Sequence, residues 1–193
     1  MGIIYSVSTG QEQSEKEDQI RPGLHCDTGR ITVLGLGNIL LSDEGIGVHA
    51  VRSLGQRYIL PPGVEVVDGG TMGLDLLPIF QTQDKILIID AVDFKQAPGH
   101  VRVISGKDIP TVLNAKLSVH HIGLSDVLFA AKLMREVPPE ICLIGLQPRS
   151  LDIGLDMTEE IRVQLDSVIS LAIQKLREWN IECVLQSPQR SSV

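Results

Sequence analysis

Five short apolar runs, separated by stretches of helical periodicity, set the pattern of the chain from residue 31 onward. The hydrophobicity of ITVLGL, KILIID and ICLIGL is continuous rather than alternating, which is typical of strands covered on both faces. The runs predict strands over residues 31–36, 64–67, 85–90, 100–104 and 141–146. Continuous apolar strands that alternate with helical segments indicate an α/β fold.

The segments between these runs carry apolar residues on one helical face. They predict helices over residues 46–58, 124–134 and 161–179, and a weaker helix over 72–81 that Pro78 interrupts. The segment 93–99 is too short for a crossover helix, so we expect strand 100–104 to run antiparallel to its predecessor, at an edge. The predicted architecture is α/β: a mostly parallel twisted sheet of about five strands between helical layers, in a single domain.

The two ends of the chain differ from this body. Residues 1–30 include the polar stretch QEQSEKEDQ, which has no hydrophobic periodicity, and we expect a disordered tail there. The first six residues also fit an N-myristoylation pattern, which is short and often matches by chance. We place the domain at residues 31–182 and expect residues 183–193 to be frayed.

Composition narrows the class of protein. A chain of 193 residues with 43% apolar residues can bury one core, and its net charge of −7 disfavours nucleic acid as a partner. No apolar run is long enough to span a bilayer, and the N-terminus lacks the features of a signal peptide. We therefore expect a soluble cytoplasmic protein that binds no membrane. Cys26, Cys142 and Cys183 are odd in number and widely spaced, so we expect reduced thiols.

The segment GLGNILLSDEGIGV lies where a Rossmann fold has its phosphate-binding loop. Gly35 and Gly37 fit the G-x-G-x-x-G pattern, but Leu40 occupies the third glycine position. Asp43 and Glu44 also bring negative charge to the place where a pyrophosphate would bind. Dinucleotide binding is accordingly the alternative hypothesis rather than the main one.

Ser42 is a suitable helix N-cap, which would place Asp43 and Glu44 in the first helical turn. Simple electrostatics at a helix end would explain these two acids. A second candidate acid, Asp90, ends a buried strand, at the edge of the sheet where α/β proteins bind ligands.

The adjacent His120 and His121 precede a predicted helix and offer nitrogen ligands. One His, one Asp and one Glu would form an open mixed site suited to nickel or zinc, although no spacing in the sequence requires them to converge. The chain has neither G-x-S-x-G nor H-E-x-x-H, and we assign no separate catalytic nucleophile.

The run VLGLGNILLSDEGIGVHAV resembles the opening motif of the hydrogenase maturation protease family. Four further blocks resemble the family's successive motifs in the same order: GVEVVDGGTMGLDLLP, LIIDAVDFKQAPG, KLSVHHIGLSDVL and ICLIGLQPRSLDIGLDMTEEI. The resemblance covers about residues 31–180, and five ordered blocks are far more specific than one short motif.

The resemblance implies an endopeptidase that removes the C-terminal extension of a nickel-iron hydrogenase large-subunit precursor after nickel insertion. It also implies that Glu44, Asp90 and His120 are the metal ligands, and that the nickel is bound together with the substrate, without an organic cofactor. Two features depart from the family pattern: His121 stands next to the histidine of the motif, and the 30-residue tail has no counterpart in the family's core.

Overall fold

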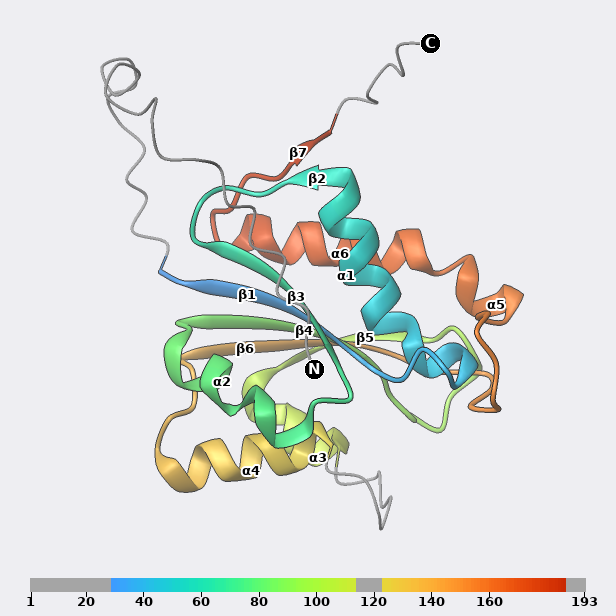
Figure 1. The fold of residues 1–193 in the computed structure, drawn as a ribbon, viewed down its shortest axis with the longest axis horizontal. Coiled ribbons are helices and arrows are strands. Elements are labelled where there is room, and N and C mark those ends of the chain that lie inside the picture. Colours follow the sequence, from blue (N-terminus) through green and yellow to red (C-terminus); the bar gives the residue numbers. More distant parts are fainter. Residues whose placement is uncertain (1–28, 114–122, 187–193) are drawn as a thin grey trace.

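A five-stranded sheet forms the centre of the computed structural model, which describes residues 29–113 and 123–186. The strand order is β3-β1-β4-β6-β5 (Figure 1). The four parallel strands are β1 (Ile31–Leu36), β3 (Val64–Gly70), β4 (Lys85–Ala91) and β6 (Glu140–Leu146). This arrangement confirms the predicted mostly parallel sheet.

The remaining strand of this sheet, β5 (Val101–Ser105), lies at an edge and runs antiparallel. Its direction and edge position were both expected from the short segment before it. It pairs with β6, so that Ile104 lies opposite Leu143, and not with β4, its predecessor in the sequence. The edge next to β4 is already taken by β6, which leaves the outer side of β6 for β5.

Helices cover both faces of the sheet. On one face lie α1 (Ile46–Arg57) and α6 (Leu165–Glu178), and on the other lie α2 (Leu77–Thr82), α3 (Ile109–Leu113) and α4 (Leu124–Met134) (Figure 1). Neighbouring residues of β1 point to opposite sides, so that Val33 belongs to the core under α1 and α6 and Leu34 to the core under α2 and α4. Both faces are therefore buried, as the continuous apolar runs predicted.

Two predicted helices are divided into shorter pieces. The segment 161–179 consists of α5 (Glu159–Arg162) and α6, which begins at Leu165. The segment 72–81 consists of the 3₁₀ helix η2 (Gly73–Leu76) followed by α2. Pro78 does not interrupt α2 but lies in its first turn, where a missing N–H costs no helical hydrogen bond. The 3₁₀ helix η3 (Gly106–Asp108) and α3 are too short to show periodicity.

A second, two-stranded sheet joins β2 (Tyr58–Ile59) to β7 (Val184–Leu185). β7 lies beyond the predicted domain boundary at residue 182, in the segment expected to be frayed. Its two residues pair with partners 125 and 127 positions earlier in the chain, so local composition could not indicate the pairing. No helix within residues 29–113 and 123–186 is both long and apolar enough to cross a membrane.

Candidate active site

The loop after β1 folds tightly against the start of α1. A Cβ added to Gly37 would lie 1.8 Å from the carbonyl oxygen of Glu44, and one added to Gly35 would lie 2.3 Å from that of Gly47. No side chain fits at either position, because protein backbone occupies the space. The two glycines of the apparent dinucleotide pattern thus have a packing role within the chain itself, while Leu40 in the third position is exposed.

Ser42 does not cap a helix, contrary to expectation. It begins the 3₁₀ helix η1 (Ser42–Gly45) with a φ of 49°, and its hydroxyl donates a hydrogen bond to the carbonyl oxygen of Asp152, 3.0 Å away. Its N–H donates to the carbonyl oxygen of Gly154. The residue faces the segment after β6, and this tertiary contact prevails over the local preference of serine for an N-cap.

Asp43 is fully buried, and electrostatics at a helix end do not account for it. Its Oδ2 accepts hydrogen bonds from the N–H groups of Arg149 (3.0 Å) and Ser150 (2.9 Å) and from the hydroxyl of Thr158 (3.0 Å). Its Oδ1 accepts one from the N–H of Thr158 (2.7 Å). The carboxylate therefore joins η1 to residues 149–158, a role that sequence analysis missed because the donors are more than 100 positions away.

Glu44 and Asp90 lie at the same edge of the sheet. Glu44 is half-buried in η1, which packs against β4, and Asp90 is the buried next-to-last residue of β4. Strand β4 extends one residue further than predicted, to Ala91. Because β1 and β4 are parallel neighbours, the loop after β1 and the end of β4 meet at their carboxyl ends.

His120 and His121 lie outside the described residues. Among residues 29–113 and 123–186, no group of three or more His, Cys, Asp or Glu side chains is close enough to hold a metal ion. Glu44 and Asp90 supply oxygen donors only, and the nitrogen donor of the predicted site would come from the segment before α4. The three-ligand site therefore stays a prediction.

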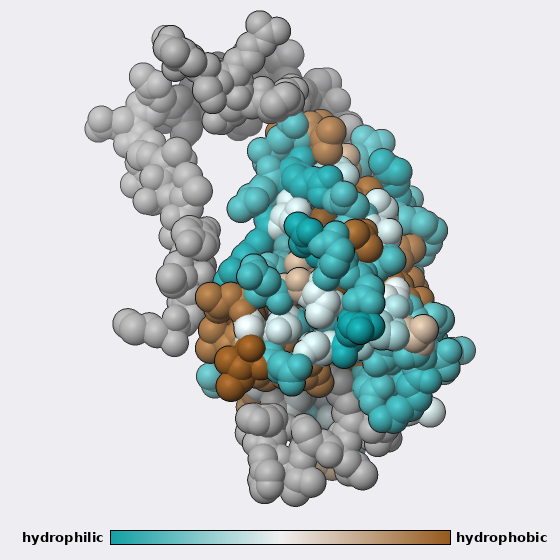
Figure 2. All heavy atoms as spheres, turned by 90° about the vertical axis from the view of Figure 1, so that its right-hand side faces the viewer, coloured by the Kyte–Doolittle hydropathy of each residue, from teal (hydrophilic) through white to brown (hydrophobic). Residues whose placement is uncertain are grey.

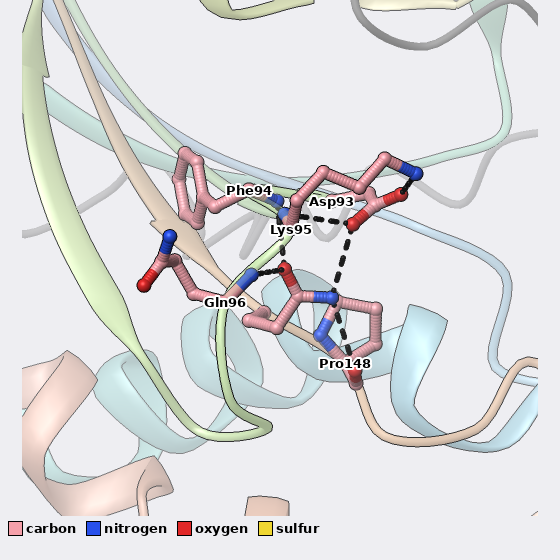
Figure 3. A network of polar contacts seen from close by, with 6 residues as sticks. Asp93, Phe94, Lys95, Gln96 and Pro148 are labelled. Carbon is pink, nitrogen blue, oxygen red and sulfur yellow. Dashed lines mark hydrogen bonds and ion pairs between the residues drawn. The ribbon is translucent and has the colours of Figure 1, made fainter.

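The loop that follows Asp90 is held by Gln147, a buried residue directly after β6. Its Oε1 accepts hydrogen bonds from the N–H groups of Phe94 (2.7 Å) and Gln96 (3.3 Å). Its Nε2 donates to Oδ1 of Asp93 (3.3 Å), and Asp93 in turn pairs with Lys95 (Figure 3). Lys95 holds the pKa of the Asp93 carboxyl below its ordinary value through its ammonium group and its N–H.

The segment after β6 thus touches both loops that carry the candidate acids. Gln147 holds the loop after Asp90, and residues 149–158 hold η1 with Glu44. The sequence of this segment resembles a motif of the family, but the motif alone predicted no role for its residues. A glutamine directly after a buried strand, at the ligand-binding edge, was the available signal.

Comparison with known proteins shows which family the chain belongs to. The sequence profile described as hydrogenase maturation protease matches residues 48–175. The hydrogenase 2 maturation protease of Escherichia coli (strain K12) is 40% identical over 156 residues, which are 80% of this chain and 95% of that protein. The chain belongs to the hydrogenase maturation protease family.

Solved structures of the family share the fold. The hydrogenase maturating endopeptidase HybD from Escherichia coli superposes with a TM-score of 0.77 at 39% identity, over 81% of this chain and 98% of that chain. A nickel-iron hydrogenase maturation protease, HybD from Thermococcus kodakarensis, gives a TM-score of 0.60 at 27% identity, over 76% of this chain and 98% of that chain. As a member of the family, the chain is a hydrogenase maturation endopeptidase and hence a hydrolase.

Exposed apolar side chains flank the candidate active site of this protease. Leu40 precedes η1, and Ile153 and Leu155 flank Gly154, whose N–H donates to the carbonyl oxygen of Leu40 at 2.9 Å. Ile153 is 92% exposed. Figure 2 views the side of the molecule that carries η1 and α5 and shows hydrophobic side chains gathered on the lower part of a largely hydrophilic face. Apolar residues exposed beside a site are typical of a surface that contacts another protein.

Proposed function

We propose that this chain removes the C-terminal extension of a nickel-iron hydrogenase large-subunit precursor after nickel has been inserted. Membership of the family supports the reaction class, and the Thermococcus kodakarensis relative is a maturation protease of a nickel-iron hydrogenase. The observation that carries the proposal is the placement of η1 against β4, which brings Glu44 and Asp90 to one edge of the sheet.

The nickel ion belongs to the substrate in this proposal. Glu44, Asp90 and His120 would contact an ion that the precursor already holds, because three protein ligands leave coordination positions open for groups of the substrate. Only a nickel-loaded precursor would then complete the contact. Recognition of the substrate would therefore also ensure that cleavage follows nickel insertion. At the scissile bond such an ion can polarise the carbonyl group or lower the pKa of a bound water.

The thiols of the described residues fit this proposal. Burial raises the pKa of the Cys142 thiol to about 11 and also raises that of Cys183. A nucleophilic cysteine requires the opposite change, a lowered pKa. Cys26 lies outside the described residues.

A cytoplasmic location stays a prediction.

Intact-mass measurement of cleavage tests the proposal. We expect the purified chain to shorten a nickel-loaded precursor and to leave a nickel-free one intact. Glu44→Gln and Asp90→Asn should stay folded and lose processing, because each removes a charged ligand. The matched control is Asp84→Asn, since Asp84 accepts a hydrogen bond from the N–H of Arg30 at the opposite edge of the sheet. Normal processing by both site variants would overturn the metal site.

A further inference from the structure

Asp43 lies directly before the candidate ligand Glu44 and accepts four hydrogen bonds, yet the proposed mechanism gives it no role. Its carboxylate is completely buried among donors from Arg149, Ser150 and Thr158. A buried carboxylate is costly unless hydrogen bonds compensate its charge, and the four donors among the described residues do so. The arrangement needs an explanation beyond helix capping, because these donors all lie in the segment between β6 and α5 and not in η1.

The helix that carries Glu44 depends on external contacts. η1 has only four residues and no side-chain cap, and a single 3₁₀ turn is not stable alone. The segment after β6 also accepts hydrogen bonds from the backbone of η1. The N–H of Ser42 donates to the carbonyl oxygen of Gly154, and the N–H of Asp43 donates to that of Ser150. Contacts to residues 149–158 therefore set where the backbone of Glu44 lies.

We infer that Asp43 is a positioning residue that fixes Glu44 for contact with substrate-bound nickel by anchoring η1 to residues 149–158. The inference rests on the proposed function, in which Glu44 contacts the nickel ion of the precursor. The carboxylate of Asp43 itself accepts hydrogen bonds from the backbone N–H groups of Arg149, Ser150 and Thr158.

Asparagine is the appropriate substitution, because it keeps the shape and removes the charge. Both carboxylate oxygens of Asp43 face backbone N–H donors, so the amide NH₂ of Asp43→Asn must face at least one of them in either orientation. Thr158→Val is a milder variant, since it removes the hydroxyl donor and keeps the N–H of residue 158.

The test measures binding of nickel-loaded and nickel-free precursor to the full chain. For Asp43→Asn we expect the Kd of the nickel-loaded form to rise about tenfold to a hundredfold, as for other residues that orient a metal ligand. The Kd of the nickel-free form should change less than about twofold, because it does not use Glu44. Thr158→Val should raise the Kd of the nickel-loaded form by a smaller factor and leave that of the nickel-free form nearly unchanged. Asp84→Asn should leave both constants unchanged.

Two results would overturn the inference. In one, Asp43→Asn weakens binding of both precursors equally, which indicates a general structural role. In the other, neither constant changes. If Asp43→Asn does not fold by circular dichroism, Thr158→Val alone decides by the same comparison. Glu44→Gln separates this inference from the proposed function: if that variant keeps the full preference for nickel-loaded precursor, the proposed function itself is wrong.

Discussion

Gly47 in the first turn of α1 lies directly on the backbone of Ile89 in β4, so closely that an added Cβ would be 2.1 Å from the carbonyl oxygen of Ile89. The carbonyl oxygen of Leu36 would be 2.3 Å from the same Cβ. At Gly47 the start of α1 therefore meets the backbone of β1 and β4 with no side chain between them. This close approach puts Glu44, three residues before Gly47, beside the strand that carries Asp90.

Gly47→Ala should destabilise the protein by about 3 kcal/mol, because the methyl group would collide with two backbone carbonyls that cannot rotate away. Gly55 in the same helix is the matched control, since it is exposed and has no atom within 4 Å of an added Cβ. Gly55→Ala should stabilise by about 0.5–1 kcal/mol through helix propensity. Urea unfolding of both variants measures the difference. Equal effects would show that α1 does not pack on β4 in this way.

The two adjacent histidines differ in their expected roles. The resemblance to the family motif makes His120 the expected ligand, so His120→Ala should abolish processing of nickel-loaded precursor. His121→Ala should retain measurable activity, reduced at most about tenfold to a hundredfold. Intact mass of the processed precursor distinguishes the variants. The reverse result would move the ligand to His121, and normal processing by both would refute the three-ligand site.

Gln147→Leu should lower the free energy of unfolding by about 1–3 kcal/mol, because the N–H groups of Phe94 and Gln96 lose their acceptor. Processing should slow as well, since the affected loop follows Asp90. Gln81→Leu is the control: its amide bonds Glu136 at an exposed position, so the expected change is within about 0.5 kcal/mol. Denaturant unfolding and processing rates together test this expectation. Unchanged values for Gln147→Leu would show that the network around Gln147 contributes nothing.

Alkaline pH should weaken the fold through Cys142. The thiol has an ordinary pKa of 9.0, and burial raises it to about 11, an effect that Lys175 partly opposes. Between these values the unfolded chain has lost the thiol proton while the folded chain keeps it, so the free energy of unfolding falls as pH rises from about 9 to 11. The stability that the Cys142 thiol contributes is complete below pH 9 and is lost above the pKa of about 11 that it has in the folded chain.

Cys142→Ala isolates this effect from the other groups that titrate at alkaline pH. The wild type should lose about 2–3 kcal/mol more than the variant between pH 9 and 11, in urea unfolding at each pH. Cys142→Ala should also process precursor normally, because the buried thiol is not the nucleophile. Identical pH slopes would contradict the burial effect, and an inactive folded variant would contradict the absence of a thiol nucleophile.

Local patterns determined the fold class and the family. Continuous apolar runs predicted strands buried on both faces, and the short segment before β5 predicted its antiparallel edge position; both predictions are confirmed. The ordered motifs placed the chain in its family, which the comparisons confirm. The fold class and the family depend on hydrophobic periodicity and on the order of residues, so the sequence alone is enough to predict them. The assignment of Glu44, Asp90 and His120 as ligands stays a prediction.

Only the tertiary structure decided what the residues between the strands do. The sequence predicts a helix-end charge at Asp43 and an N-cap at Ser42, yet both residues bond to a segment more than 100 positions away. The glycines of the apparent phosphate loop lie against the backbone of η1 and α1. The partners of a buried polar group are set by which loops meet at the sheet edge. Which loops meet depends on the order of the strands in the sheet, and hydrophobic periodicity along the chain does not determine that order.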